Sequence, residues 1–185
     1  MISEKIVEDG RMRRNGKIAS VLVVMMLSLV LLAGCGGKKV TLRRVTYDIP
    51  NNYKLSSQSG SDTATYTASN GFEDGAVLRF NSSLGDLYDS TTFDKECGRY
   101  ADSCLKSIPE VSNYSIVSNA KTKWLGMPAI KFTANAVSNT GKSLVVEGIF
   151  AYDSDNNAVY NISLTRPSTS FTNDFQNILD KAKIN

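Results

Sequence analysis

The sequence of 185 residues contains no histidine. Without histidine, the chain cannot build a Ser-His-Asp or Cys-His nucleophile system, a histidine general base or most catalytic zinc sites. Carboxylates and lysines can still catalyse reactions, but the acidic residues fall in predicted turns and on predicted helix surfaces. No pair of them has a spacing that suggests an acid–base couple. We therefore expect a protein that is not an enzyme and that uses no cofactor.

Cysteine is also scarce, with three residues at positions 35, 97 and 104. Redox catalysis favours a Cys-x-x-Cys pair, and the sequence has none. Cys97 and Cys104 fall in one predicted helix, where seven residues would separate their Cα atoms by about 10.5 Å. This exceeds the ~7 Å limit for a disulfide, so we favour buried free thiols. Export together with a helix break at Gly98 would instead allow a bridge.

One stretch imitates a metal site. Asp153, Asp155 and Asn157 match positions 1, 3 and 5 of a calcium-binding loop. Position 6 is Ala158 where such loops have glycine, and position 12 is Leu164 where they have glutamate. The stretch is more typical of a hairpin turn, and we predict no metal site.

The longest uncharged apolar stretch is Ile18 to Leu32, fifteen residues that follow a cationic segment. A charged segment followed by an apolar core of this length is typical of an export signal. A membrane-spanning helix needs about 20 residues, and this one would reach that length only by including three glycines. A retained transmembrane anchor and an ordinary secretory signal are the alternatives. The cationic residues are Arg11, Arg13, Arg14 and Lys17.

The apolar run ends in Leu32-Ala33-Gly34-Cys35, which resembles the lipobox of bacterial lipoproteins. The resemblance implies that a signal peptidase recognises Leu32, Ala33 and Gly34 and cleaves before Cys35. The Cys35 thiol would carry a diacylglyceryl group, with fatty acids such as palmitate as the anchor. The sequence thus predicts a signal peptide over residues 1–34 and a protein held by lipid on the extracytoplasmic face of the cell membrane.

Basic residues cluster directly after the lipidation site, at Lys38, Lys39, Arg43 and Arg44. We expect residues 35–41 to form a basic tether beside the membrane, where each cation near anionic headgroups adds about 1 kcal/mol. An ordinary solvated linker explains the same charges. Removal of residues 1–34, with five basic and three acidic residues, leaves 16 basic against 15 acidic residues. This near-neutral balance argues against nucleic acid as a partner.

Residues 42–185 are expected to form one α+β domain. Alternating apolar positions predict strands, and helical spacing predicts two amphipathic helices. The apolar face of an antiparallel sheet, with Ile130, Phe132 and Phe150 on it, would be covered by the final helix through Phe175 and Ile178. The expected strands are Leu42 to Ile49, Tyr53 to Ser56, Ala64 to Ser69, Ala76 to Ser82, Tyr114 to Trp124, Ala129 to Ser138, Ser143 to Asp153 and Ala158 to Arg166, and the helices are Thr92 to Ile108 and Thr169 to Lys183.

This order resembles the PsbP-like superfamily, an α/β/α sandwich named for an extrinsic photosystem II subunit. The matching segments are Val45 to Pro50, Trp124 to Ala129, Ala158 to Leu164 and Phe175 to Leu179, and the resemblance covers residues 42–185. It implies an antiparallel sheet covered by helices. Because these segments are packing signals, none of the family's functional residues can be placed here.

Relatives in that superfamily resemble binding or assembly factors. We therefore expect a membrane-anchored surface lipoprotein that acts as a non-enzymatic binding or assembly module for an envelope protein or polymer. Trp124, the single tryptophan, is a candidate partner contact, although a place at the edge of the core is the more ordinary role. The alternatives are a small histidine-independent envelope hydrolase and a solute-binding lipoprotein, which usually needs two lobes.

The lipobox prediction can be tested at one residue. Cys35→Ala should abolish both lipid labelling and cleavage of the signal peptide, because the thiol is the acceptor of the lipid. Metabolic labelling with a fatty acid and the size of the mature protein measure both effects. Persistence of both would contradict the lipobox assignment.

Overall fold

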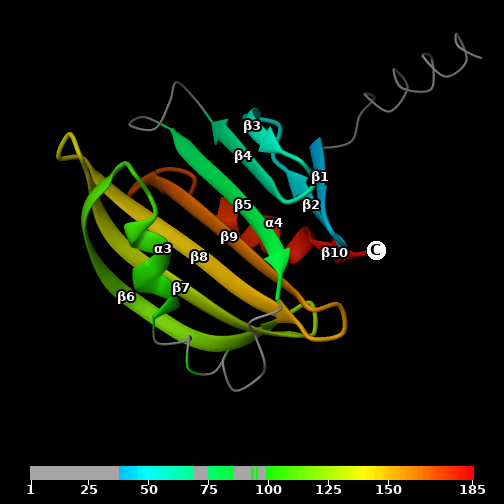
Figure 1. Cartoon of the computed structure of the whole chain (residues 1–185). Coiled ribbons are helices and arrows are strands. Elements are labelled where there is room, and N and C mark those ends of the chain that lie inside the picture. The colour runs from blue at the N-terminus through cyan, green and yellow to red at the C-terminus, as the bar shows by residue number, and fades with distance from the viewer. Residues whose placement is uncertain (1–37, 69–74, 86–92, 94, 96–98) are drawn as a thin grey trace, which may run out of the picture. The chain divides into compact units, whose positions relative to one another are not determined.

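The computed structural model describes residues 38–68, 75–85, 93, 95 and 99–185. The residues from Gly37 to Asn185 form a compact unit, in which a large antiparallel sheet lies between two layers (Figure 1). Its elements, in chain order, are β1 (Lys38–Leu42), β2 (Val45–Ile49), β3 (Tyr53–Ser59), β4 (Thr63–Ala68), β5 (Ala76–Leu84), α3 (Tyr100–Lys106), β6 (Val111–Trp124), β7 (Met127–Ser138), β8 (Ser143–Asp153), β9 (Ala158–Pro167), α4 (Asp174–Lys181) and β10 (Lys183–Ile184).

The central sheet has seven strands in the order β3-β4-β5-β9-β8-β7-β6. The last four in sequence form a meander, because short turns join β6 to β7, β7 to β8 and β8 to β9. β5 pairs with β9 and thereby joins the first hairpins to the meander. A second sheet, β1-β2-β10, has three strands. The α+β fold with an antiparallel sheet, as expected from the sequence, is confirmed.

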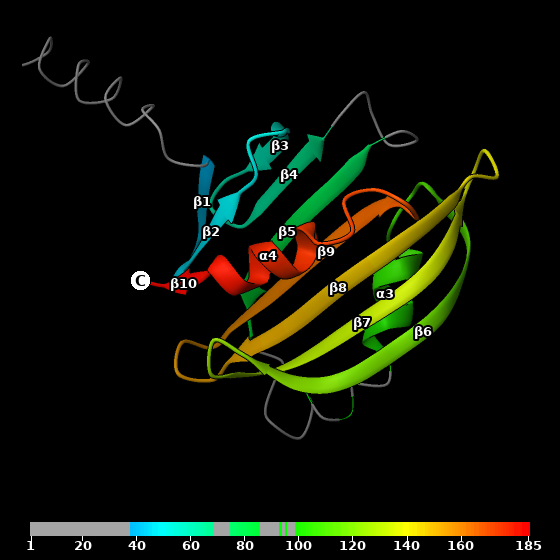
Figure 2. The ribbon, with the colours of Figure 1, turned by 180° about the vertical axis from the view of Figure 1, so that it is seen from behind.

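One face of the seven-stranded sheet is covered by the small sheet and α4, which we call the α4 face (Figure 2). Trp124 connects these layers. Its ring stacks on Tyr47 of β2 with centroids 6.0 Å apart, and its edge meets Tyr160 of β9 at 6.4 Å. The indole Nε1–H donates to the carbonyl of Leu179 in α4 at 3.2 Å. Burial of a large ring with its polar atom satisfied favours this arrangement of the layers.

The opposite face, the α3 face, packs against α3 (Figure 1). The ring of Tyr100 lies edge-on to Phe132 with centroids 5.7 Å apart and contacts Phe150 at 4.7 Å. The Tyr100 hydroxyl is also bonded to Asn161 of β9. The helix therefore covers the middle of the meander, with apolar contacts around a satisfied hydroxyl.

The sequence prediction assigned the wrong helix to one face. Ile130, Phe132 and Phe150 lie on the α3 face, whereas Phe175 and Ile178 of the final helix pack on the α4 face. Each face of the sheet carries its own cluster of buried apolar side chains, so each face needs its own cover. An alternating pattern shows that residues share a face but does not show which element packs on it.

The first predicted strand, Leu42 to Ile49, is in fact a hairpin of β1 and β2. The turn is Arg43-Arg44, with Arg43 at a φ of 52°. A turn of this kind is predicted from Gly, Asn or Asp. Because two arginines occupy it here, the sequence did not predict the turn. Arg43 pairs with Asp62 at 3.4 Å and Arg44 with Asp153 at 3.5 Å.

Both helices are shorter than predicted. α4 begins at Asp174, because Phe171 has a φ of 57° and interrupts the helical backbone. α3 confirms the predicted helix over Tyr100–Lys106, while most of its predicted first half, including Cys97, lies outside the described residues. The state of Cys97 therefore stays a prediction, while the favoured buried free thiol is confirmed at Cys104.

The contact between Gly148 and Phe132 provides a test of the α3 face. The two residues are opposite each other in register, and a Cβ on Gly148 would lie 2.2 Å from Phe132 Cε1. Phe132 is fully buried and held by Tyr100, so it cannot move aside. Gly148→Ala should lower the free energy of unfolding by about 1–3 kcal/mol in chemical denaturation. Ser143→Ala, at an exposed position on the same strand, should stay within about 0.5 kcal/mol; equal effects would contradict this packing.

The buried thiol of Cys104 provides a second test. Burial raises the pKa of Cys104 to about 11, so roughly one thiol in ten thousand is ionised at pH 7. Because the thiolate is the reactive form, iodoacetamide should leave Cys104 unmodified in the native protein at neutral pH and modify it in denaturant. Peptide mass spectrometry measures both. Rapid native alkylation of Cys104 would contradict its placement on the buried face of α3.

Candidate binding surface

Strand β6 forms one edge of the seven-stranded sheet and pairs, among the described strands, with β7 alone. It is 14 residues long, and every residue from Ser115 to Lys123 is exposed. Exposed apolar side chains are included: Val117 is 63% exposed and Ile116 is 40% exposed. An edge strand presents a row of unpaired backbone N–H and C=O groups that can accept another strand. β6 is therefore a candidate docking edge.

Two bulges divide this edge. The register with β7 shifts between Val111 and Asn113, and again between Ile116 and Ser118. A bulge bends its strand and interrupts the ladder, so the longest regular segment of the edge is Ser118 to Trp124. An incoming strand would find about seven residues of continuous ladder there.

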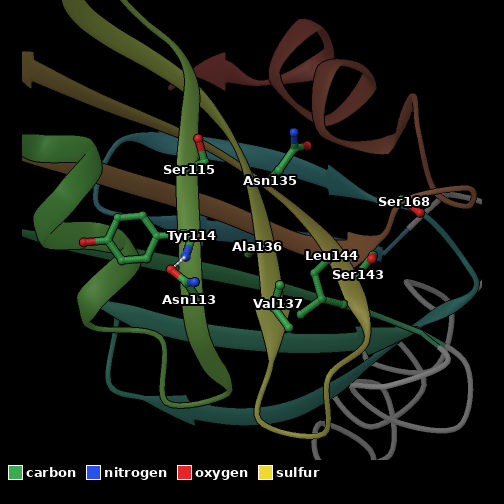
Figure 3. A pocket seen from close by; sticks show the side chains of 9 residues that line it. All are labelled: Asn113, Tyr114, Ser115, Asn135, Ala136, Val137, Ser143, Leu144 and Ser168. Atoms are coloured by element: carbon green, nitrogen blue, oxygen red, sulfur yellow. Dashed lines mark hydrogen bonds between the residues drawn. The ribbon is translucent and has the colours of Figure 1, made fainter.

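A hollow of about 390 Å³ lies beside the edge, over the ends of β6, β7 and β8 (Figure 3). Lys131 of β7 contacts α4 through Gln176 and the ring of Phe175, so Asn135, four residues further along the strand, lies on the α4 face too. Ser115 is opposite Asn135 in register. The hollow is thus the part of the α4 face that α4 and the small sheet leave open. Its lining residues are Asn113, Tyr114, Ser115, Asn135, Ala136, Val137, Ser143, Leu144 and Ser168.

The chemistry of the hollow is neutral. Hydroxyl and amide side chains supply its polar groups, and none of the nine lining residues is a carboxylate, lysine, arginine or cysteine. The Tyr114 side chain points away from the other side chains, towards α3 (Figure 3), where its hydroxyl bonds Asp102. General acid–base catalysis needs a group that titrates near the working pH. The hollow offers instead uncharged donors and acceptors suited to a peptide backbone or a glycan.

Several charged side chains elsewhere are held in ion pairs. Arg79 binds Glu110 through two hydrogen bonds of 2.8 and 2.9 Å. Arg166 donates to Glu147 at 2.9 Å, and both side chains are largely buried. Paired groups of this kind hold elements together. No cluster of three or more His, Cys, Asp or Glu side chains that could hold a metal occurs within the described ranges.

A second hollow, of about 340 Å³, lies between the end of β2 and α4. Asp48 and Asp174 line it together with Lys181. Asp174 accepts a hydrogen bond from the Tyr53 hydroxyl at 3.0 Å. Neither carboxylate is buried. A hydrolase without histidine would rely on carboxylates from different elements, and in this hollow Asp48 of β2 and Asp174 of α4 meet that requirement.

Several residues predicted to form a tether or a surface contact lie instead in strands or in the core. Trp124 is 7% exposed and lies in the core, so its ring is not available to a partner; burial between three layers is the reason. Lys38 and Lys39 are the first residues of β1, and Arg43 and Arg44 form its turn. Leu32, Ala33, Gly34 and Cys35 lie outside the described residues, and their assignment stays a prediction. The Asp153–Asn157 stretch is the turn between β8 and β9, as expected, with the Asn156 amide bonded to Asp153.

The exposed edge was missed as a site, although the sequence carried a signal. From Ser115 to Lys123 the strand has only two large apolar residues, which are adjacent in sequence and break the alternation. A strand with one buried face alternates between apolar and polar residues. The absence of that alternation indicates that little of β6 packs on a core.

Comparison with solved structures supports the fold. Mog1p of Saccharomyces cerevisiae, a Ran-binding protein, has a TM-score of 0.56 at 10% identity, covering 80% of this chain and 95% of its own. LpqN of Mycobacterium tuberculosis, which is involved in cell envelope biogenesis, has 0.53 at 15%, covering 82% and 87%. PsbP (CyanoP) of Synechocystis sp. PCC 6803 has 0.49 at 8%, covering 83% and 99%. No protein-family model and no curated protein matches the sequence.

At these identities the likeness shows the fold alone, which this chain shares with Mog1p and LpqN. The same fold occurs in a Ran-binding protein and in an envelope protein, so it does not by itself determine a partner. In the part of the chain that the structure describes, no helix is long and apolar enough to cross a membrane.

Proposed function

We propose that this protein is a lipid-anchored, non-enzymatic binding module of the bacterial cell envelope. Cys35 holds it to the membrane, and the β6 edge with its adjoining hollow engages an extended segment of an envelope protein or polymer. The observation that carries the proposal is the long exposed edge next to a hollow without carboxylate or basic side chains. Such an edge can bind an extended segment, and the hollow beside it is lined by no carboxylate or basic group for acid–base chemistry.

The binding mode follows from the geometry of the edge. A peptide segment would add as a strand along Ser118 to Trp124, where the ladder is regular. Backbone hydrogen bonds supply affinity in this mode, and pockets for alternate side chains supply specificity. Beyond the bulge, the segment would pass the hollow, whose hydroxyl and amide groups suit neutral polar side chains. A glycan strand could use the hollow but not the backbone edge.

Two further observations support this role over the alternatives. LpqN, which shares the fold, takes part in cell envelope biogenesis. A solute-binding lipoprotein usually has two lobes around a cleft, whereas residues Gly37–Asn185 form one compact unit. A hydrolase that used Asp48 and Asp174 would act through carboxylates that are partly exposed rather than held in a water-excluding cavity.

The proposal predicts that one change on β6 removes a partner. Val117, at a bulge of edge strand β6, is 63% exposed, and Leu55, at a bulge of edge strand β3, is 52% exposed. Val117→Lys should reduce the partner recovered by affinity capture from native membranes at least tenfold, because it replaces the most exposed large apolar side chain of β6, between the regular ladder and the hollow, with a charge. The measurement is quantitative mass spectrometry of the captured proteins and attached polymer.

Leu55→Lys is the matched control, since it makes the same kind of change at the other edge. It should leave recovery unchanged. The proposal fails if no partner is recovered reproducibly with the natural sequence, or if Leu55→Lys is the variant that loses it. Both variants should unfold at the same temperature as the natural protein, because neither side chain is buried.

A further inference from the structure

The lipid anchor and the folded domain are separated by very little chain. Only Gly36 and Gly37 lie between Cys35 and Lys38, where β1 begins. Three residue steps span at most about 11 Å even when fully extended. If Cys35 is lipidated as proposed above, Lys38 is therefore held within about one headgroup layer of the hydrocarbon. The expected tether over residues 35–41 is instead largely a strand.

The first residue of the domain is fixed to its surroundings. The Lys38 ammonium donates to the carbonyls of Asn51 and Tyr53, in and after the turn from β2 to β3. The backbone of Lys38 pairs with that of Ile49, the last residue of β2. The short connection thus leads into a part of the fold held by several contacts. The short connection therefore limits how far this part of the domain can lie from the lipid, and its orientation has to come from further contacts with the membrane.

The surface around this point is basic. Lys38, Lys39 and Lys54 are exposed, and Lys181 of α4 lines the neighbouring hollow. Two carboxylates lie among them: Asp48 is opposite Lys39 in register, and Asp174 accepts the Tyr53 hydroxyl. Four cations against two anions leave a net positive surface, which we call the anchor-proximal patch. Lysine ammonium groups beside a membrane attract anionic phospholipid headgroups.

From the short connection and this charge, we infer that the anchor-proximal patch docks on anionic phospholipid, so that the domain stands on the membrane in one orientation. This inference rests on the proposed lipid anchor. β3 adjoins the patch through the contact of Lys38 with Tyr53, and β6 is the opposite edge of the sheet, six strand positions away. At about 4.8 Å per strand, that is roughly 29 Å along the sheet. Figures 1 and 2 show β1 and β6 on opposite sides of the domain.

The orientation gives the two surfaces separate tasks. The patch faces the lipid, and the β6 edge with its hollow is directed away from it, where an extended partner can reach. The specific lipid contact also accounts for the lysines at the start of β1 and β3. An anchor alone requires no charge at these positions.

The single tryptophan of the chain allows a direct test. Trp124 ends β6 where that strand meets the small sheet, and its ring lies 6.0 Å from Tyr47, which pairs with Val40, two residues from Lys38. The lipidated mature protein is placed in vesicles of phosphatidylcholine, with or without phosphatidylglycerol, that carry a dansyl acceptor on the headgroups. Energy transfer from Trp124 should be higher with phosphatidylglycerol and should fall to the phosphatidylcholine level at 1 M salt, where charges are screened beyond about 3 Å.

Variants identify the surface responsible. Lys39→Gln with Lys54→Gln should abolish the increase caused by phosphatidylglycerol. Lys123→Gln with Lys131→Gln removes the same charge near the far edge and should preserve it. Equal transfer in both vesicle types, or loss of the increase only in the second pair, would overturn the docking while leaving the anchor intact. Mass spectrometry of Cys35 distinguishes the two failures, because a protein without the diacylglyceryl group would contradict the anchor and the docking together.

Discussion

Both faces of the seven-stranded sheet carry large apolar side chains, and each face therefore has to be covered. On one side this is done by α3 through Tyr100, on the other by α4 and the small sheet, with Trp124 packed between them. These covers lie over the middle of the sheet and over β3 to β9. Strand β6 meets α3 at Tyr114 and α4 at Trp124, but between these two contacts its side chains, from Ser115 to Lys123, face solvent. The exposed edge is a direct consequence of how two short helices and a small sheet cover a wide one.

The open edge and the point where the chain enters the domain lie at opposite ends of the strand order. The chain enters the domain at β1, beside β3, and the open edge lies at the other end of the strand order. Exposed lysines gather near the chain entry, although β6 and β7 carry Lys123 and Lys131 as well, and the hollow beside β6 is lined by uncharged hydroxyl and amide groups. Attachment and recognition therefore fall on surfaces with different chemistry. That separation is what we expect of a module whose work is to hold a partner near a membrane.

Much of the fold was predictable from alternation and turn residues. The strands of the meander lie within three residues of their predicted ends, because Gly141 and the Asp153–Asn157 stretch mark its turns. The Arg43-Arg44 turn could not be found in this way, since neither residue favours a left-handed backbone. The assignment of helices to faces also failed, because periodicity is a local property and the choice of cover depends on the path of the whole chain.

The binding surface was less predictable than the fold. Trp124 is a reasonable partner contact when only its neighbours in sequence are known, but its ring is enclosed by Tyr47 and Tyr160, which lie far away in the chain. The hollow arises where β6, β7 and β8 end together, and no single segment encodes it. β6 is exposed because neither helix and neither strand layer among the described residues packs over its middle. Absence of a cover is a tertiary property that a local pattern indicates only weakly.

The central claim is that β6 is the edge that a partner occupies. Amide hydrogen exchange, followed by peptide mass spectrometry on the protein alone and on the captured complex, tests it most directly. In the protein alone, β6 should exchange faster than β8 and β9, whose amides are paired on both sides. In the complex, the account predicts new protection over Ser118 to Trp124 with little change in β3. Protection at β3 or at the hollow of Asp48 and Asp174, with β6 unchanged, would contradict it.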